Sequence, residues 1–235
     1  MAQFARYWGD CPFRRYLATN EIAAAFDGFE TLRLGEDVSW SDNLSRALAA
    51  IEEDYVLLFL EDLILKAPVD RRLLTAAMEW ARANLPDHLR LNASERPDER
   101  VNSRLGRIRE GSHYRTSTVL TLWKKSVLSA LLRPGESAWQ FELVGSARSD
   151  AYPRFYSTYA DCFPVINCVI KGKWRPSAVR ALAAQGVSVD LAARAPMTRG
   201  QDLAFRAREL RSRVFKLVPM RYRRSVRSCF YRRRR

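Results

Sequence analysis

The chain has 235 residues, of which 47% are hydrophobic and 28% charged, and a formal net charge of +14. Its length predicts one domain with an appendage, and its apolar content excludes a wholly disordered chain, which would lack residues to bury. The longest unbroken apolar run, at 55–60, has six residues. A membrane-spanning helix needs about 20, so an integral membrane protein is excluded. We expect no signal peptide, because charged residues interrupt the N-terminal segment at Arg6, Asp10, Arg14 and Arg15.

The chain has four cysteines, none in a CxxC pair, and two histidines. Structural zinc sites and disulfide frameworks need characteristic spacings of these residues. The composition therefore argues against both and favours a reducing cytoplasm. We assign no function to His88 or His113 from the sequence, since each stands alone.

The positive charge is concentrated at the C-terminal end. Residues 201–235 contain 12 arginines and Lys216 against two acids, Asp202 and Glu209, which gives a net charge of +11. Residues 1–200 therefore carry a net charge of only +3. We predict a near-neutral folded domain at 1–198 followed by a basic, amphipathic tail at 199–235.

Short strands and helices alternate along the predicted domain. In chain order, we predict strands at 13–19 and 31–34, a helix from the capping residues 39–42 to 51, a buried strand at 55–60, a helix at 70–84 and a strand at 89–91. There follow a polar loop at 92–112, a strand at 114–119, a helix at 122–132, a helix capped by Ser137, a strand at 163–170 and a helix at 176–185. This alternation predicts an α/β fold with a mostly parallel sheet flanked by helices.

Two adjacent carboxylates, Glu61 and Asp62, directly follow the buried strand at 55–60. Ligands of open α/β sheets bind outside the carboxyl ends of strands. Paired carboxylates at such a place can hold a hard divalent cation, which neutralises a diphosphate. The alternative is that Asp62 caps a helix while Glu61 is solvated.

Five segments, taken in their order and spacing, resemble a group of bacterial sugar transferases associated with surface polysaccharides. They are WSDNL at 40–44, YVLLFLED at 55–62, YRTS at 114–117, GESAWQFE at 135–142 and KGKW at 171–174. This group is similar to the GT-A superfamily of nucleotide-sugar glycosyltransferases, and the resemblance covers residues 4–190. It implies a GT-A-like, Rossmann-like sheet that binds a nucleotide-sugar donor.

The resemblance also implies roles for four carboxylates. GT-A enzymes end a central strand in an acidic motif that holds a metal and the donor diphosphate, and Asp62, with Glu61, stands in the matching place. The implied cofactor is a divalent cation, Mn²⁺ or Mg²⁺, although the motif lacks a second aspartate two positions on. Glu142 matches the carboxylate that deprotonates the acceptor hydroxyl, with Glu136 as the second candidate. A surface glutamate within a helix is the ordinary alternative for Glu142.

Three further residues are candidates for donor binding. Tyr114 and Arg115 could stack on a sugar or base and pair with phosphate, because arginine presents a planar fork to phosphate oxygens. Lys173, beside Gly172, could contact the diphosphate. The alternative for Tyr114 and Arg115 is a strand pair on a solvated face, and the alternative for Lys173 is an ordinary basic turn. The first strand–helix unit of a GT-A domain is absent from the chain, so we expect Met1 to be an internal start or the gene to be truncated.

The basic tail combines arginines with apolar residues at helical spacing, from Leu203 to Leu217. Such a segment can lie on an anionic membrane or grip nucleic acid, or it can be a solvated helix with a disordered end. We favour the membrane, because polysaccharide acceptors are often lipid-linked and the near-neutral body has no second basic patch.

The sequence thus predicts a glycosyltransferase that moves a sugar from a nucleotide-sugar donor to a surface polysaccharide or lipid-linked glycan. It would be cytoplasmic, and peripheral at the inner face of the plasma membrane. The alternatives are an inactive or truncated relative that acts as a membrane-associated assembly partner, and a nucleic-acid-binding protein that uses the arginine-rich tail.

Overall fold

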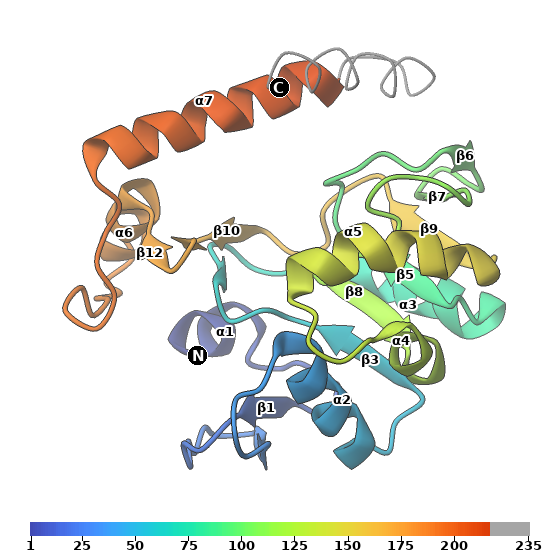
Figure 1. Ribbon diagram of the computed structural model, residues 1–235, viewed down its shortest axis with the longest axis horizontal. Coiled ribbons are helices and arrows are strands. Elements are labelled where there is room, and N and C mark those ends of the chain that lie inside the picture. The colour runs from blue at the N-terminus through green and yellow to red at the C-terminus, as the bar shows by residue number, and fades with distance from the viewer. Residues whose placement is uncertain (217–235) are drawn as a thin grey trace. The chain divides into compact units, whose positions relative to one another are not determined.

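The computed structural model describes residues 1–216, with side chains up to residue 211 (Figure 1). The chain divides into two compact units, Met1–Ile166 and Asn167–Arg235. This division lies before the predicted boundary at 198–199, because Trp174 holds the chain near 196 by two backbone hydrogen bonds. The Trp174 N–H donates to Ala195 O (3.1 Å), and the Met197 N–H donates to Trp174 O (2.8 Å). Residues 217–235 of the predicted tail lie outside the described residues.

The first unit is built on a six-stranded sheet in the order β3-β8-β5-β9-β7-β6. Its strands are β3 (Tyr55–Leu58), β5 (His88–Arg90), β6 (Glu99–Arg100), β7 (Leu105–Arg107), β8 (Thr121–Lys124) and β9 (Phe155–Thr158). Only the β5–β9 pairing is parallel, and the other four are antiparallel. The chain therefore has the predicted α/β class, but its main sheet is mixed, and the expectation of a mostly parallel sheet is not confirmed.

Two segments account for this difference. The predicted loop at 92–112 contains β6 and β7, which form an antiparallel ladder beside β9. The predicted strand at 114–119 is irregular, and the strand instead forms at β8, where a helix was predicted to begin. β8 runs antiparallel to both of its neighbours, so the α4 helix (Lys125–Leu131) begins only after it.

Helices cover both faces of the main sheet (Figure 1). One face carries Leu89 and Leu122, which share a buried cluster with Leu74 and Ala77 of α3 (Arg71–Asn84). The other face carries Trp123 of β8 and Phe155 of β9, which share a buried cluster with residues of α4 and α5 (Ala138–Arg148). Successive strand residues point to opposite faces, so each strand contributes to both layers.

Capping residues set the starts of three helices, as predicted. Ser39 caps α2 (Trp40–Ala50) by accepting from the Asp42 N–H, and Asp70 caps α3 by accepting from the Leu73 N–H. Ser137 and Gln140 form a reciprocal capping box at the start of α5. Each such cap satisfies backbone donors that the first helical turn leaves without partners.

The other elements of the first unit lie outside the six-stranded sheet. They are α1 (Ala2–Trp8), the parallel pair β1 (Tyr16–Thr19) and β2 (Glu30–Arg33), β4 (Leu63–Leu65), the short 3-10 helix η1 (Ser149–Ala151) and β10 (Val165–Asn167), which pairs with β4. The predicted strand at 163–170 is thus divided, and its second part is β11 (Val169–Ile170).

The second unit is smaller. It contains β11, which pairs with β12 (Lys173–Trp174), then α6 (Pro176–Ala183) and α7 (Arg199–Lys216). Pro176 stands in the first turn of α6, as predicted. No helix within residues 1–216 is long and apolar enough to cross a membrane.

His88 lies in the aromatic layer of the main sheet and is fully buried. Its ring stacks on Phe155 at 4.7 Å and meets the edge of Trp123 at 4.6 Å. Burial, reinforced by the charges of Arg90 and Arg115, holds the pKa of His88 well below its usual range. The imidazole therefore stays neutral in the folded chain, whereas it gains a proton in the unfolded chain below a pH of about 6.5.

We expect this difference to make the fold sensitive to mild acid. A histidine that is neutral only in the folded state stabilises the fold above its unfolded pKa, and this contribution is lost as the pH falls below that value. Between roughly pH 7.5 and pH 5.5, the free energy of unfolding should therefore fall by about 1.4 kcal/mol because of His88. Urea unfolding at both pH values should show a smaller loss in His88→Phe than in the wild type. The exposed His113 supplies the control, His113→Phe. An equal loss of unfolding free energy in His88→Phe and the wild type would show that His88 is not the source of the acid sensitivity.

Candidate functional site

One edge of the main sheet collects most of the residues singled out in the sequence. The pairings make β3, β5 and β9 run in one direction and β8 in the other. The carboxyl ends of those three strands and the amino end of β8 therefore meet at one edge, which we call the carboxyl edge. It comprises residues 59–62, 91–97, 114–120 and 159–161. Backbone bonds join these segments, from Leu91 N–H to Leu120 O and from Cys162 N–H to Leu91 O (both 2.9 Å).

Glu61 and Asp62 form a tight turn at this edge, between β3 and β4. The Leu63 N–H donates to Leu60 O across the turn (3.1 Å). Glu61 is exposed and Asp62 is half-buried. A strand follows, and the next helix is capped by Asp70, so Asp62 does not cap a helix. The helix cap expected of Asp62 in the alternative interpretation is therefore wrong, whereas Glu61 is exposed, as that alternative expects. The role of the pair in metal or diphosphate binding stays a prediction.

The Glu142 carboxylate is fixed at the same edge. It projects from α5 and its Oε1 accepts two hydrogen bonds from Thr118, one from the backbone N–H (2.8 Å) and one from Oγ1 (2.9 Å). Thr118 is buried and Glu142 is half-buried. Within the described part of the chain, its Oε2 makes no hydrogen bond.

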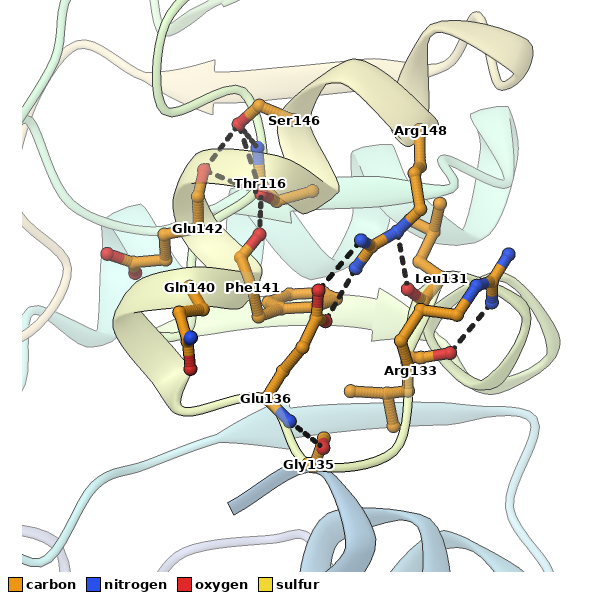
Figure 2. A network of polar contacts seen from close by, with 12 residues as sticks. Thr116, Leu131, Arg133, Gly135, Glu136, Gln140, Phe141, Glu142, Ser146 and Arg148 are labelled. Carbon is orange, nitrogen blue, oxygen red and sulfur yellow. Dashed lines mark hydrogen bonds and ion pairs between the residues drawn. The ribbon is translucent and has the colours of Figure 1, made fainter. Parts of the chain in front are cut away.

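The segment that presents Thr118 is itself held by polar contacts. Thr116 Oγ1 lies 3.2 Å from the carbonyl oxygens of Phe141 and Glu142, and Ser146 Oγ donates to Glu142 O (2.6 Å). Figure 2 shows these contacts between the segment and α5. The hydroxyl groups thus fasten the segment to the helix that carries the carboxylate.

Glu136 lies in a different environment. Its carboxylate forms a two-pronged ion pair with Arg148, with N–O distances of 2.8 and 2.7 Å, and both side chains are largely buried. In Figure 2 the Glu142 carboxylate points away from this pair. The Glu136 side chain therefore links the turn before α5 to the last residue of that helix, and its role as a base, which would need a free carboxylate, stays a prediction.

Arg115 is completely buried, contrary to what a donor-binding residue requires. Its guanidinium donates to Ile108 O (3.4 Å), Tyr152 O (2.7 Å) and Ser149 Oγ (2.9 Å), as well as to Ser149 O. It also lies 4.0 Å from the centre of the Phe155 ring. The geometry favours a structural role, in which Arg115 anchors the carboxyl-edge segment to η1.

Arg90 is a residue of this edge that the sequence analysis missed. Its side chain is buried at the end of β5, and Nη2 donates to Tyr114 O (2.5 Å). Burial lowers the pKa of Arg90, while the charges of Glu95 and Glu142 act in the opposite sense. The positive charge of Arg90 is thus attracted to the negative charge of Glu142, and its side chain holds Tyr114, whose backbone has a φ of 51°. The sequence signal that could have identified Arg90 is a charged residue within the otherwise apolar strand at 88–91.

A hollow of about 400 Å³ opens beside the carboxyl ends of β5 and β9. Its lining combines an aromatic ring, a carboxylate, a guanidinium and a hydroxyl, and consists of Ala93, Glu95, Arg96, Pro97, Thr158 and Tyr159. Polar groups and one aromatic ring are suited to a hydroxylated ligand. The sequence analysis places 93–97 in the loop at 92–112, predicts no element at Thr158 and Tyr159, and gives none of these residues a role.

The remaining candidates are Lys173 and a metal ion. Lys173 lies in the second unit, where its Nζ donates to Gln201 Oε1 (3.3 Å). Among residues 1–216, no group of three or more His, Cys, Asp and Glu side chains is placed to hold a metal ion. Two adjacent carboxylates can still suffice for Mg²⁺, which is often bound by one or two carboxylates together with substrate phosphates.

Comparison of the chain with protein-family models, with curated proteins and with solved structures gave no match.

The Thr118–Glu142 contact can be tested through stability. Thr118→Val removes the hydroxyl donor to a half-buried carboxylate at nearly constant volume, and hydrogen bonds to charged groups contribute about 1.5–3 kcal/mol. We expect the free energy of unfolding in urea to fall by about that amount. Thr118→Ser keeps the hydroxyl and should lose clearly less. Equal losses in the two variants would show that the hydroxyl does not hold Glu142.

Proposed function

We propose that the chain is a glycosyltransferase with a GT-A-like arrangement, which transfers a sugar from a nucleoside-diphosphate sugar to a hydroxyl of a surface polysaccharide or lipid-linked glycan. The observation that carries the proposal is the placement of Glu142. Its carboxylate is held by Thr118 at the edge of the sheet that also carries Asp62. The five sequence segments that resemble sugar transferases include both residues. The mixed main sheet does not support a GT-A-like fold, so the support for the proposal comes from the residues of the carboxyl edge.

In this proposal Glu142 is the general base. Its Oε2 accepts the proton of the acceptor hydroxyl, whose oxygen forms a bond to the anomeric carbon of the donor sugar. The bond between that carbon and the diphosphate oxygen breaks, and the nucleoside diphosphate leaves with the electron pair. Thr118 contributes by fixing the direction of the carboxylate, since a base acts only within hydrogen-bond reach of its proton.

Asp62 and Glu61 would receive the diphosphate end of the donor. A divalent cation held by these two carboxylates and the phosphate oxygens would neutralise the charge that develops on the leaving group. The hollow lined by Glu95 and Tyr159 has the chemistry to accept sugar hydroxyls, because it combines hydrogen-bonding groups with a ring face.

Donor binding is tested by isothermal titration of UDP, GDP, CDP and dTDP, with and without Mn²⁺. We expect one of these nucleotides to bind the wild type, and binding to weaken at least about tenfold in Asp62→Ala, which corresponds to roughly 1.4 kcal/mol. Glu79→Ala, which removes an exposed carboxylate of α3, is the matched control and should bind like the wild type. A wild type that binds none of them would contradict the proposal and favour an inactive assembly partner.

Catalysis is tested with Glu142→Gln, which preserves the size of the side chain and removes its basicity. We expect the release of nucleoside diphosphate from the bound sugar nucleotide, with membrane lipids as acceptor, to fall by about 10²–10⁴-fold. Nucleotide affinity should be unchanged. Transfer at the wild-type rate by Glu142→Gln would exclude Glu142 as the base, whatever the outcome for Asp62.

A further inference from the structure

One face of α7 is held within the second unit. It consists of Asp202, Phe205 and Glu209, at the spacing of a single helix face. Arg175 binds this face, with Nη2 at 3.2 Å from Glu209 Oε2 and its guanidinium at 4.7 Å from the centre of the Phe205 ring. Asp202 is buried, with an exposed fraction of 9%. These contacts fix the rotation of α7 about its own axis.

The opposite face carries an apolar stripe. Leu203, Ala207 and Leu210 follow one another at intervals of four and three residues, and the two leucines are 70% and 64% exposed. This is the stripe that the sequence predicts, but it is turned outward, because the cation–π contact and the ion pair of Arg175 take the other face inward. Single exposed leucines are common, whereas a stripe along one helix face indicates a binding surface.

Arginines flank this stripe on both sides. At 3.6 residues per turn, Arg206 lies on one side of it, and Arg211, then Arg208, lie on the other. All three are exposed. Arg206 pairs with Asp202 at 2.9 Å, and residues 201–235 as a whole carry a net charge of +11. The exposed face of α7 is therefore apolar along its centre and cationic along its borders.

We propose that this outward face of α7, with Leu203, Ala207 and Leu210 at its centre, binds an anionic lipid surface. The leucines would enter the boundary between headgroups and acyl chains, while the flanking arginines contact lipid phosphates, each basic residue adding about 1 kcal/mol near the surface. Nucleic acid would account for the arginines but would leave the leucines in water. The proposal is independent of glycosyl transfer, since it concerns only residues of the second unit.

Arg175 has a defined part in this arrangement. By holding Phe205 and Glu209, it keeps the leucine stripe outward before any membrane is met, so no helix rotation is needed for docking. Such pre-organisation reduces the ordering cost of binding.

The test is co-sedimentation of the full-length chain with vesicles of phosphatidylcholine alone and of phosphatidylcholine mixed with phosphatidylglycerol. We expect salt-sensitive binding to the mixed vesicles only. The double variant Leu203→Gln/Leu210→Gln should bind them at least about tenfold more weakly, because its central apolar surface is gone. Leu191→Gln is the matched control, since Leu191 is also exposed (44%) in the second unit but lies outside α7.

Several outcomes would overturn the proposal. The first is a double variant that binds vesicles as tightly as the wild type, which would assign binding to charge alone. The second is a wild type that prefers RNA or DNA when these compete with the vesicles. The third is a wild type that forms a dimer which the double variant abolishes, with no vesicle binding by either. Because the substituted leucines are exposed, thermal unfolding should be unchanged, which separates loss of binding from loss of folding.

Discussion

Two guanidinium groups are buried inside the first unit, and the carboxyl edge depends on how their charges are accommodated. A buried charge is costly unless its donors reach acceptors. Arg115 meets this condition with the carbonyl oxygens of Ile108, Ser149 and Tyr152, whereas Arg90 meets it in part, since Nη2 donates to Tyr114 O and the buried Nε has no hydrogen-bond partner among the described residues. The segment before β8 supplies the Tyr114 carbonyl oxygen to Arg90, and it carries the Arg115 side chain to acceptors outside the segment, at Ile108, Ser149 and Tyr152. Its irregular course is compatible with both sets of contacts.

The course of the segment before β8 also positions the candidate site residues of the carboxyl edge. With Arg90 and Arg115 holding its start, the segment delivers Thr118 to Glu142 and continues into β8, which pairs with β3 just before the Glu61–Asp62 turn. The arginines thus act on the candidate site by position, through the backbone. In the second unit an arginine has a similar effect, because Arg175 determines which face of α7 is turned outward.

Local signals predicted the parts of the fold that local interactions decide. Helix starts at Ser39, Asp70 and Ser137 were predictable because a cap is a contact within one turn. The strand at β8 was not, since Leu122 and Trp123 fit a helix as well as a strand, and only pairing with β3 and β5 selects the strand. β6 and β7 have two and three residues, too few for a period to show.

The residue types of the candidate site could be predicted from the sequence, but the contacts that each side chain makes could be predicted only in part. Glu61, Asp62 and Glu142 lie at one edge of the sheet, whereas the side chains of Glu136 and Arg115 serve internal contacts. Charge type alone does not distinguish an arginine that awaits a phosphate from one that binds carbonyl oxygens, because the same planar fork serves both. On α7, periodicity identified the apolar stripe but could not indicate which face packs inward.

The central claim is that the carboxyl edge binds a nucleoside diphosphate, and amide hydrogen exchange tests it most directly. Exchange would be measured with and without the tightest-binding nucleotide and Mn²⁺. The account predicts slower exchange at 59–63 and 114–120 in the wild type, with no such slowing in Asp62→Ala. Unchanged exchange in both segments, or slowing confined to residues outside the carboxyl edge, would contradict it.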